Sequence, residues 1–158
     1  MVVDITPMII IKRLRSFKMP IELIDHKIDS TSFSGYYFAE LDGAKARTID
    51  AFLKEMASSF NFPDYFGFNY NALQECLNDL DWIEEGNYVL YIKNYDLLLS
   101  EEKPEELVGT LKLLQETSNE WANVPNFEGE DDFREQADFK VLLEKTAKSV
   151  NDLDLLDG

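Results

Sequence analysis

The sequence predicts an α/β fold: a small three-stranded parallel sheet flanked by helices, with an N-terminal extension. The chain has 158 residues, 45% of them apolar, which suffices for one domain with a sizeable core. Its segments follow the order strand, helix, helix, strand, helix, strand, and this order requires crossover connections between parallel strands. Residues 88–92 are apolar throughout, as expected of a strand that helices cover on both faces.

The first strand and the first helix follow from residues 36–60. Residues 36–41 are rich in aromatic side chains and end at Asp42 and Gly43, a turn pair, so they are predicted to form a strand. Thr48 can cap a helix. The apolar residues that follow recur at helical spacing, which predicts an amphipathic helix with this buried face: Ile49, Phe52, Leu53, Met56 and Phe60.

A second helix is predicted to begin near Asn69, after Gly67. Apolar residues at helical spacing again define its buried face, namely Leu73, Cys76, Leu77 and Leu80. Cys76 has no basic neighbour in the sequence to stabilise a thiolate, so we expect a buried, inert thiol.

The second half of the chain adds a strand, a helix and a further strand. After the strand at residues 88–92, Pro104 suits the first turn of a third helix, whose N-terminus Glu105 and Glu106 would stabilise. Its inner face is predicted to carry Leu107, Leu111 and Leu114. The short apolar run 139–143 is predicted to be the third strand, although a helical turn is also compatible with its pattern.

The chain divides into an N-terminal extension at residues 1–34, the α/β domain at residues 35–150 and an acidic tail at residues 151–158. We expect the tail and the acidic segment 128–138 to be solvated loop or fraying terminus. The extension contains apolar positions that could pack as added edge strands: Met8, Ile10, Ile21, Leu23 and Ile24.

Charge and composition exclude several functions. The 31 acidic and 15 basic residues give a net charge of −16, which disfavours binding to nucleic acid or an anionic membrane and favours a basic partner. One cysteine and one histidine, His26, exclude an internal disulfide, a multi-cysteine zinc site and paired histidine ligands, so neither a metal nor a cofactor is predicted. The cysteine count, together with the lack of a signal-peptide pattern or a membrane-length apolar run, predicts a cytoplasmic protein. No pattern predicts an oligomeric state.

Residues 62–77 carry a resemblance to a known family. They combine an aromatic-aromatic-Gly loop, an Asn cap and an Ala-Leu-x-acid-Cys-Leu helix. This segment resembles the signature of the barstar family, which consists of intracellular inhibitors of secreted ribonucleases. The strand and helix before it and the strand and helix after it also resemble that family, so the resemblance covers about residues 36–143.

The resemblance implies a barstar-like fold and a protein that is not an enzyme. It implies an inhibitor of the immunity or antitoxin kind, which binds a basic ribonuclease or a related toxin and blocks its active site with an acidic helix and the adjacent aromatic loop. Matched residue by residue, the implied partner-binding positions are Tyr65, Phe66, Gly67, Asn71, Gln74, Glu75, Asn78, Asp79 and Glu116.

Three of these positions depart from the best-known member of the family. That member has Asp, Trp and Asp where this chain has Asn71, Gln74 and Glu75. The contact face therefore loses one formal charge and one aromatic ring, and the resemblance does not specify the same ribonuclease as target.

The residues alone leave other functions open. Asn71, Glu75 and Asn78 fall on one face of the predicted helix, which could be the solvated face of a structural domain with no nuclease target. Glu75 and Asp79 could instead be the paired carboxylates of a hydrolase acting on glycosides. The aromatic residues crowded beside these acids favour a protein interface, and they are Tyr65, Phe66, Phe68 and Tyr70.

Overall fold

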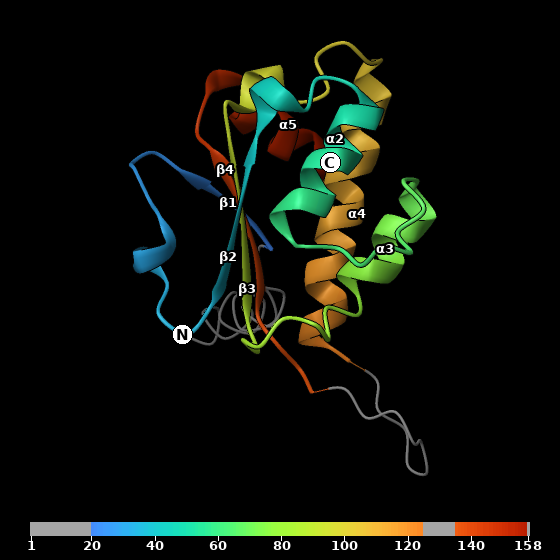
Figure 1. The fold of residues 1–158 in the computed structure, drawn as a ribbon. Helices are drawn as coiled ribbons and strands as arrows, with labels where there is room; N and C mark the ends of the chain where they lie inside the picture. Colours follow the sequence, from blue (N-terminus) through green and yellow to red (C-terminus); the bar gives the residue numbers. More distant parts are fainter. Residues whose placement is uncertain (1–19, 125–134, 158) are drawn as a thin grey trace, which may run out of the picture.

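A computed structural model describes residues 20–124 and 135–157 of the chain. Four parallel strands form one sheet in the order β1-β4-β3-β2, and helices α2, α3, α4 and α5 pack on one of its faces (Figure 1). The strands are β1 (Ile21–Ile24), β2 (Tyr37–Asp42), β3 (Tyr88–Lys93) and β4 (Phe139–Glu144). The helices are α2 (Ile49–Ser59), α3 (Tyr70–Leu77), α4 (Pro104–Ala122) and α5 (Ala147–Asp157).

The predicted three-stranded sheet is wrong by one strand, because the N-terminal extension contributes β1. This strand pairs with β4 in parallel, with Ile21 opposite Val141 and Ile24 opposite Glu144. Ile21 is buried, so joining the sheet both removes an apolar side chain from water and satisfies the backbone of the β4 edge. The run at residues 139–143 is confirmed as a strand.

Strand β3 is buried on both faces, as its continuous apolar sequence predicts. Among the described residues, the helices lie on one face of the sheet only, whereas the prediction places helices on both faces. On the face away from the helices, Val89 and Tyr91 pack against side chains of the segment between β1 and β2, including Ile28 and Phe33. This segment has only one short 3-10 turn, η2 (Ser30–Ser32). In the described residues, apolar side chains of this irregular segment exclude water from the second face of the sheet.

Helix α2 begins and buries its apolar face as predicted. The Thr48 side chain accepts a hydrogen bond from the backbone N–H of Ala51 at 3.1 Å, which caps the helix. Phe52, Leu53 and Met56 are buried against the sheet. The helix ends at Ser59, and the left-handed backbone of Asn61 (φ 52°) turns the chain into the loop that follows.

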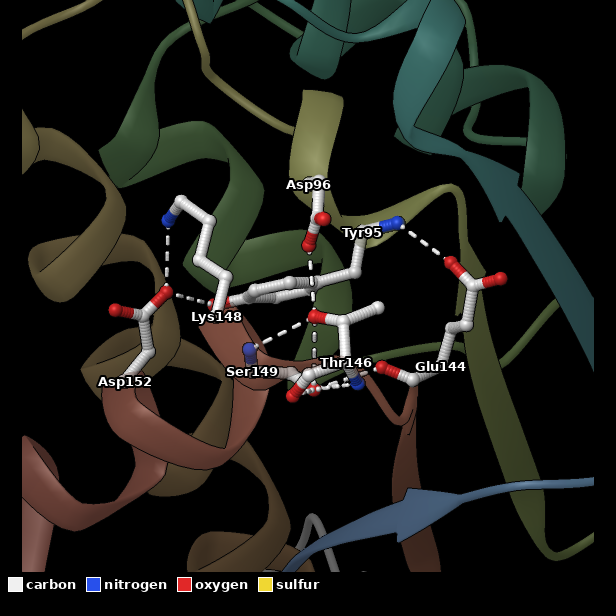
Figure 2. A network of polar contacts seen from close by, with 7 residues as sticks. All are labelled: Tyr95, Asp96, Glu144, Thr146, Lys148, Ser149 and Asp152. Atoms are coloured by element: carbon white, nitrogen blue, oxygen red, sulfur yellow. Dashed lines mark hydrogen bonds and ion pairs between the residues drawn. The ribbon is translucent and has the colours of Figure 1, made fainter.

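Helix α5 replaces most of the predicted solvated tail. It lies beside the 3-10 turn η4 (Tyr95–Leu97), where the buried Tyr95 hydroxyl donates to Asp152 at 2.8 Å (Figure 2). Lys148 pairs with the same carboxylate at 2.8 Å, and Thr146 donates to Asp96 at 2.7 Å. Burial and the adjacent Asp152 raise the pKa of Tyr95. Asp152, in the acid-rich tail, therefore has two specific partners, Tyr95 and Lys148, and its bond to Tyr95 ties α5 to η4.

Two expectations concern residues outside the described ones. One is the acidic segment 128–138, of which residues 128–134 lie outside the described ranges. The other is the first part of the extension, residues 1–19, which includes Met8 and Ile10.

Candidate functional site

A series of aromatic contacts links the sheet to the loop between α2 and α3. It runs from Phe139 in β4 to Phe60 with ring centroids 6.0 Å apart, and on to Phe62 at 6.1 Å. Phe66 lies 4.8 Å from Phe62 in an edge-to-face arrangement and 4.7 Å from Phe68. Such ring pairs add to the stability that burial alone provides. The loop is therefore supported from the core outward.

Asn69 fixes the end of this loop to the start of α3. Its side-chain oxygen accepts from the N–H of Ala72 at 2.8 Å, which caps the helix as predicted. Its amide nitrogen donates to the carbonyl of Gly67 at 3.2 Å. A Cβ on Gly67 would stand 3.3 Å from that nitrogen, so the close approach of loop and cap favours glycine.

Helix α3 presents the two faces that its sequence predicts. Leu73 and Cys76 are buried against the core, whereas Asn71, Gln74 and Glu75 are exposed. Burial and the nearby carboxylates of Asp79 and Glu75 raise the pKa of the Cys76 thiol, consistent with an inert cysteine.

The predicted helix is too long by one turn. It ends at Leu77 with Asn78 as its C-cap, and Leu80 is buried with a left-handed backbone (φ 51°). Burying the Leu80 side chain offsets the strain of this turn and ends the helix. Asp79 is therefore exposed in the turn after the helix rather than on its side.

Tyr65 stands out from the loop with 71% of its surface exposed. The slight burial of its ring and the negative charges of Asp79, Asp81 and Glu75 raise the pKa of its hydroxyl. These carboxylates therefore make the electrostatic potential around the Tyr65 ring negative. An exposed tyrosine in a negative field is a suitable anchor for a basic protein surface.

An open groove of about 420 Å³ lies between α3 and α4, next to the exposed face of α3. Its lining residues are polar throughout, namely Gln74, Asn78, Glu116, Asn119, Glu120 and Asn123. The Trp121 indole N–H donates to the carbonyl of Leu77 at 2.8 Å and so holds the C-terminal ends of the two helices together. Glu116 is thereby brought beside Gln74 and Asn78, although it is distant from both in the sequence.

Sequence reasoning missed three residues of this groove: Asn119, Glu120 and Asn123. Their spacing from Glu116 on one helix face was the available signal, because residues three, four and seven positions apart share a face. Neither α3 nor α4 has a basic residue in its last turn. Both helices therefore add the partial negative charge of their C-terminal carbonyl groups to the carboxylates of the groove.

Phe66 is the exception among the predicted partner-binding residues. It is only 5% exposed and lies in the core cluster, so it supports the loop rather than presenting a surface. The remaining positions are exposed, apart from the half-buried Asn78: Tyr65, Gly67, Asn71, Gln74, Glu75, Asp79 and Glu116.

Within residues 20–124 and 135–157, no three or more His, Cys, Asp or Glu side chains gather in an arrangement that could hold a metal ion. No helix in the same part of the chain is long and apolar enough to cross a membrane.

The fold and this surface together define a class: a parallel α/β domain that presents a short helix with exposed polar and acidic side chains and an aromatic loop. Comparison with known families identifies the family within this class. The family model described as Barstar (barnase inhibitor) matches residues 36–144, and the chain belongs to the barstar family. That family consists of inhibitors rather than enzymes, and its members bind ribonucleases. A search of curated proteins finds no match to the sequence. Strand β1 and helix α5 lie outside the matched residues.

Proposed function

We propose that this protein inhibits a small basic ribonuclease, or a related nuclease toxin, by covering its active site with α3 and the loop before it. The single observation that carries the proposal is the position of Tyr65, which is 71% exposed on the aromatic loop among the carboxylates of Glu75 and Asp79. An active site that grips RNA phosphates is lined by basic groups, and these would meet acidic groups on the inhibitor.

The groove between α3 and α4 extends this surface. Glu116 and Glu120 line it together with four side-chain amides, which offer both hydrogen-bond donors and acceptors. Asn71 and Gln74 replace an acid and an aromatic ring of the best-known family member, so polar contacts take a larger share of the proposed interface. We therefore propose that the target differs from that member's ribonuclease while keeping a basic active site.

In this proposal the protein is an immunity protein or antitoxin, which protects the cell from its target nuclease. A cytoplasmic location suits its one free cysteine. The hydrolase alternative gains no support, because the groove between α3 and α4 contains neither Glu75 nor Asp79.

Inhibition assays against a panel of small basic ribonucleases, barnase among them, test this function. Glu75→Gln should weaken inhibition of the recognised enzyme about tenfold or more, because it removes a carboxylate that would face a basic site. Asp154→Asn is the matched control, since Asp154 is an exposed acid on α5 and its loss changes the net charge equally. Equal weakening by both variants, or no inhibition of any enzyme in the panel, would contradict the proposal.

The association rate gives an independent test. Steering between exposed charges is screened beyond about 8 Å at physiological salt, so the rate constant for association should fall markedly as salt rises. A rate constant that does not change with salt would count against an acidic surface meeting a basic active site.

A further inference from the structure

Phe68 is a bulky apolar side chain that the predicted contact set does not include. Its surface is 49% exposed, next to the 71% exposed Tyr65 in the same loop. The other large apolar side chains exposed in the described part of the chain are Val150 and Leu155, and both lie on α5. The exposed aromatic surface is thus concentrated at the candidate site.

The backbone of Phe68 is also unusual. Non-glycine residues with a left-handed backbone in the described ranges are Asn61, Phe68, Leu80, Asn94 and Leu99. Asparagine tolerates this conformation, and the two leucines are buried, so their packing offsets the strain. Phe68 (φ 51°) has a bulky side chain that does not tolerate this backbone as asparagine does. Its side chain is also half exposed, so burial offsets only part of the strain. Strain of this kind that burial does not explain points to a function for the exposed ring.

The ring of Phe68 is nevertheless held in place. Its centroid lies 4.7 Å from that of the buried Phe66, and the Asn69 side chain fixes the preceding Gly67 carbonyl. An aromatic ring that is ordered before binding loses little conformational freedom when a partner covers it. Phe68 therefore has the properties of an anchor residue.

We propose that Phe68 is a second anchor in the interface and contacts an apolar patch that borders the basic active site of the ribonuclease. The inference rests on the proposed function, and it adds the chemistry of the partner surface beside the active site. A phenyl ring has no hydrogen-bonding group, so it stabilises a complex mainly when it is transferred from water into contact with apolar atoms. This contact would select among basic ribonucleases, because charge alone does not distinguish one basic active site from another.

The test compares Phe68→Asn with Phe68→Leu against the ribonuclease that the panel identifies. Asparagine suits the left-handed backbone and removes the ring, so Phe68→Asn should fold normally and yet raise the Kd at least about fivefold. Phe68→Leu keeps an apolar side chain and should retain most of the affinity. Leu155→Ala, which removes exposed apolar surface on α5, is the control and should leave the Kd unchanged.

Salt separates this contact from the charged ones. The fold-increase in Kd caused by Phe68→Asn should be the same at about 0.05 M and about 0.5 M salt, because apolar contact is not screened. The effect of Glu75→Gln should shrink at the higher salt. A Phe68→Asn effect that shrinks as well would show a charged partner surface and overturn the inference.

The outcomes distinguish this inference from the proposed function. If Glu75→Gln weakens inhibition while Phe68→Asn leaves the Kd unchanged, this inference alone fails. If both Phe68 variants lose affinity together with thermal stability, Phe68 is a structural residue and the inference is again overturned. If the wild-type protein inhibits no ribonuclease in the panel, the proposed function itself fails.

Discussion

Tyr65 and Phe66 are neighbours in the sequence, and the structure predicts opposite consequences for their truncation. Phe66 is 5% exposed and contacts the rings of Phe62 and Phe68 at 4.8 and 4.7 Å. Truncating a buried phenylalanine to alanine costs about 3–5 kcal/mol. Because the loop borders solvent and can partly collapse into the space, we expect Phe66→Ala to destabilise the protein by about 3 kcal/mol. Tyr65→Ala should change stability by less than about 0.5 kcal/mol, because most of this ring already faces water.

Urea denaturation followed by tryptophan fluorescence measures this difference. The Trp82 ring lies 6.1 Å from that of Phe62, and its indole N–H donates to the carbonyl of Phe60 at 2.9 Å, so it reports on the base of the loop. Tyr65→Ala should keep the urea midpoint and lose inhibition. Phe66→Ala should lower the midpoint, and Phe66→Leu should restore most of it. If both alanine variants shift the midpoint equally, or if Phe66→Ala is as stable as the wild type, the assignment of Phe66 to the core is refuted.

Three further predictions concern the core and the sheet. Leu73→Ala should cost about 2–5 kcal/mol in urea denaturation, because Leu73 is fully buried; a loss below about 1 kcal/mol would place it outside the core. Cys76 should react slowly with a thiol reagent in the native protein and rapidly once denatured, and rapid native labelling would contradict its burial. A hydrogen bond to Asp138 raises the pKa of Tyr36 to about 12, above the ordinary tyrosine pKa of about 10, so this tyrosine stabilises the fold fully below pH 10 and loses that contribution as pH rises towards 12. Between pH 10 and pH 12, the free energy of unfolding should fall less in Tyr36→Phe than in the wild type. The buried Tyr95 should account for part of the fall that remains.

The sequence by itself determined the local structure of the candidate site. Helical periodicity placed Leu73 and Cys76 on the buried face of α3 and Asn71 and Glu75 on the exposed one, and the structure has them there. The sequence also predicted a helix start near Asn69, and the resemblance to the barstar family implied that this residue is the cap. Periodicity and capping depend on residues within a few positions of one another, so one sequence suffices to predict them.

Only the tertiary structure decided which aromatic residues of the loop are buried. Tyr65, Phe66 and Phe68 lie within four positions, and an irregular loop has no period that would assign one ring to the core and another to solvent. Phe66 is buried because Phe62 is placed to receive it, and Phe62 is supported in turn by rings that reach back to β4.

The tertiary structure also decided which distant segments complete the domain and its surface. Strand β1 joins the sheet through the backbone of β4, and α5 is held by Tyr95, far from it in the sequence. The groove exists because Trp121 fastens the end of α4 to the end of α3. Each of these contacts joins residues whose separate sequence patterns contain no information about their partner, so packing of the whole chain was needed to bring them together.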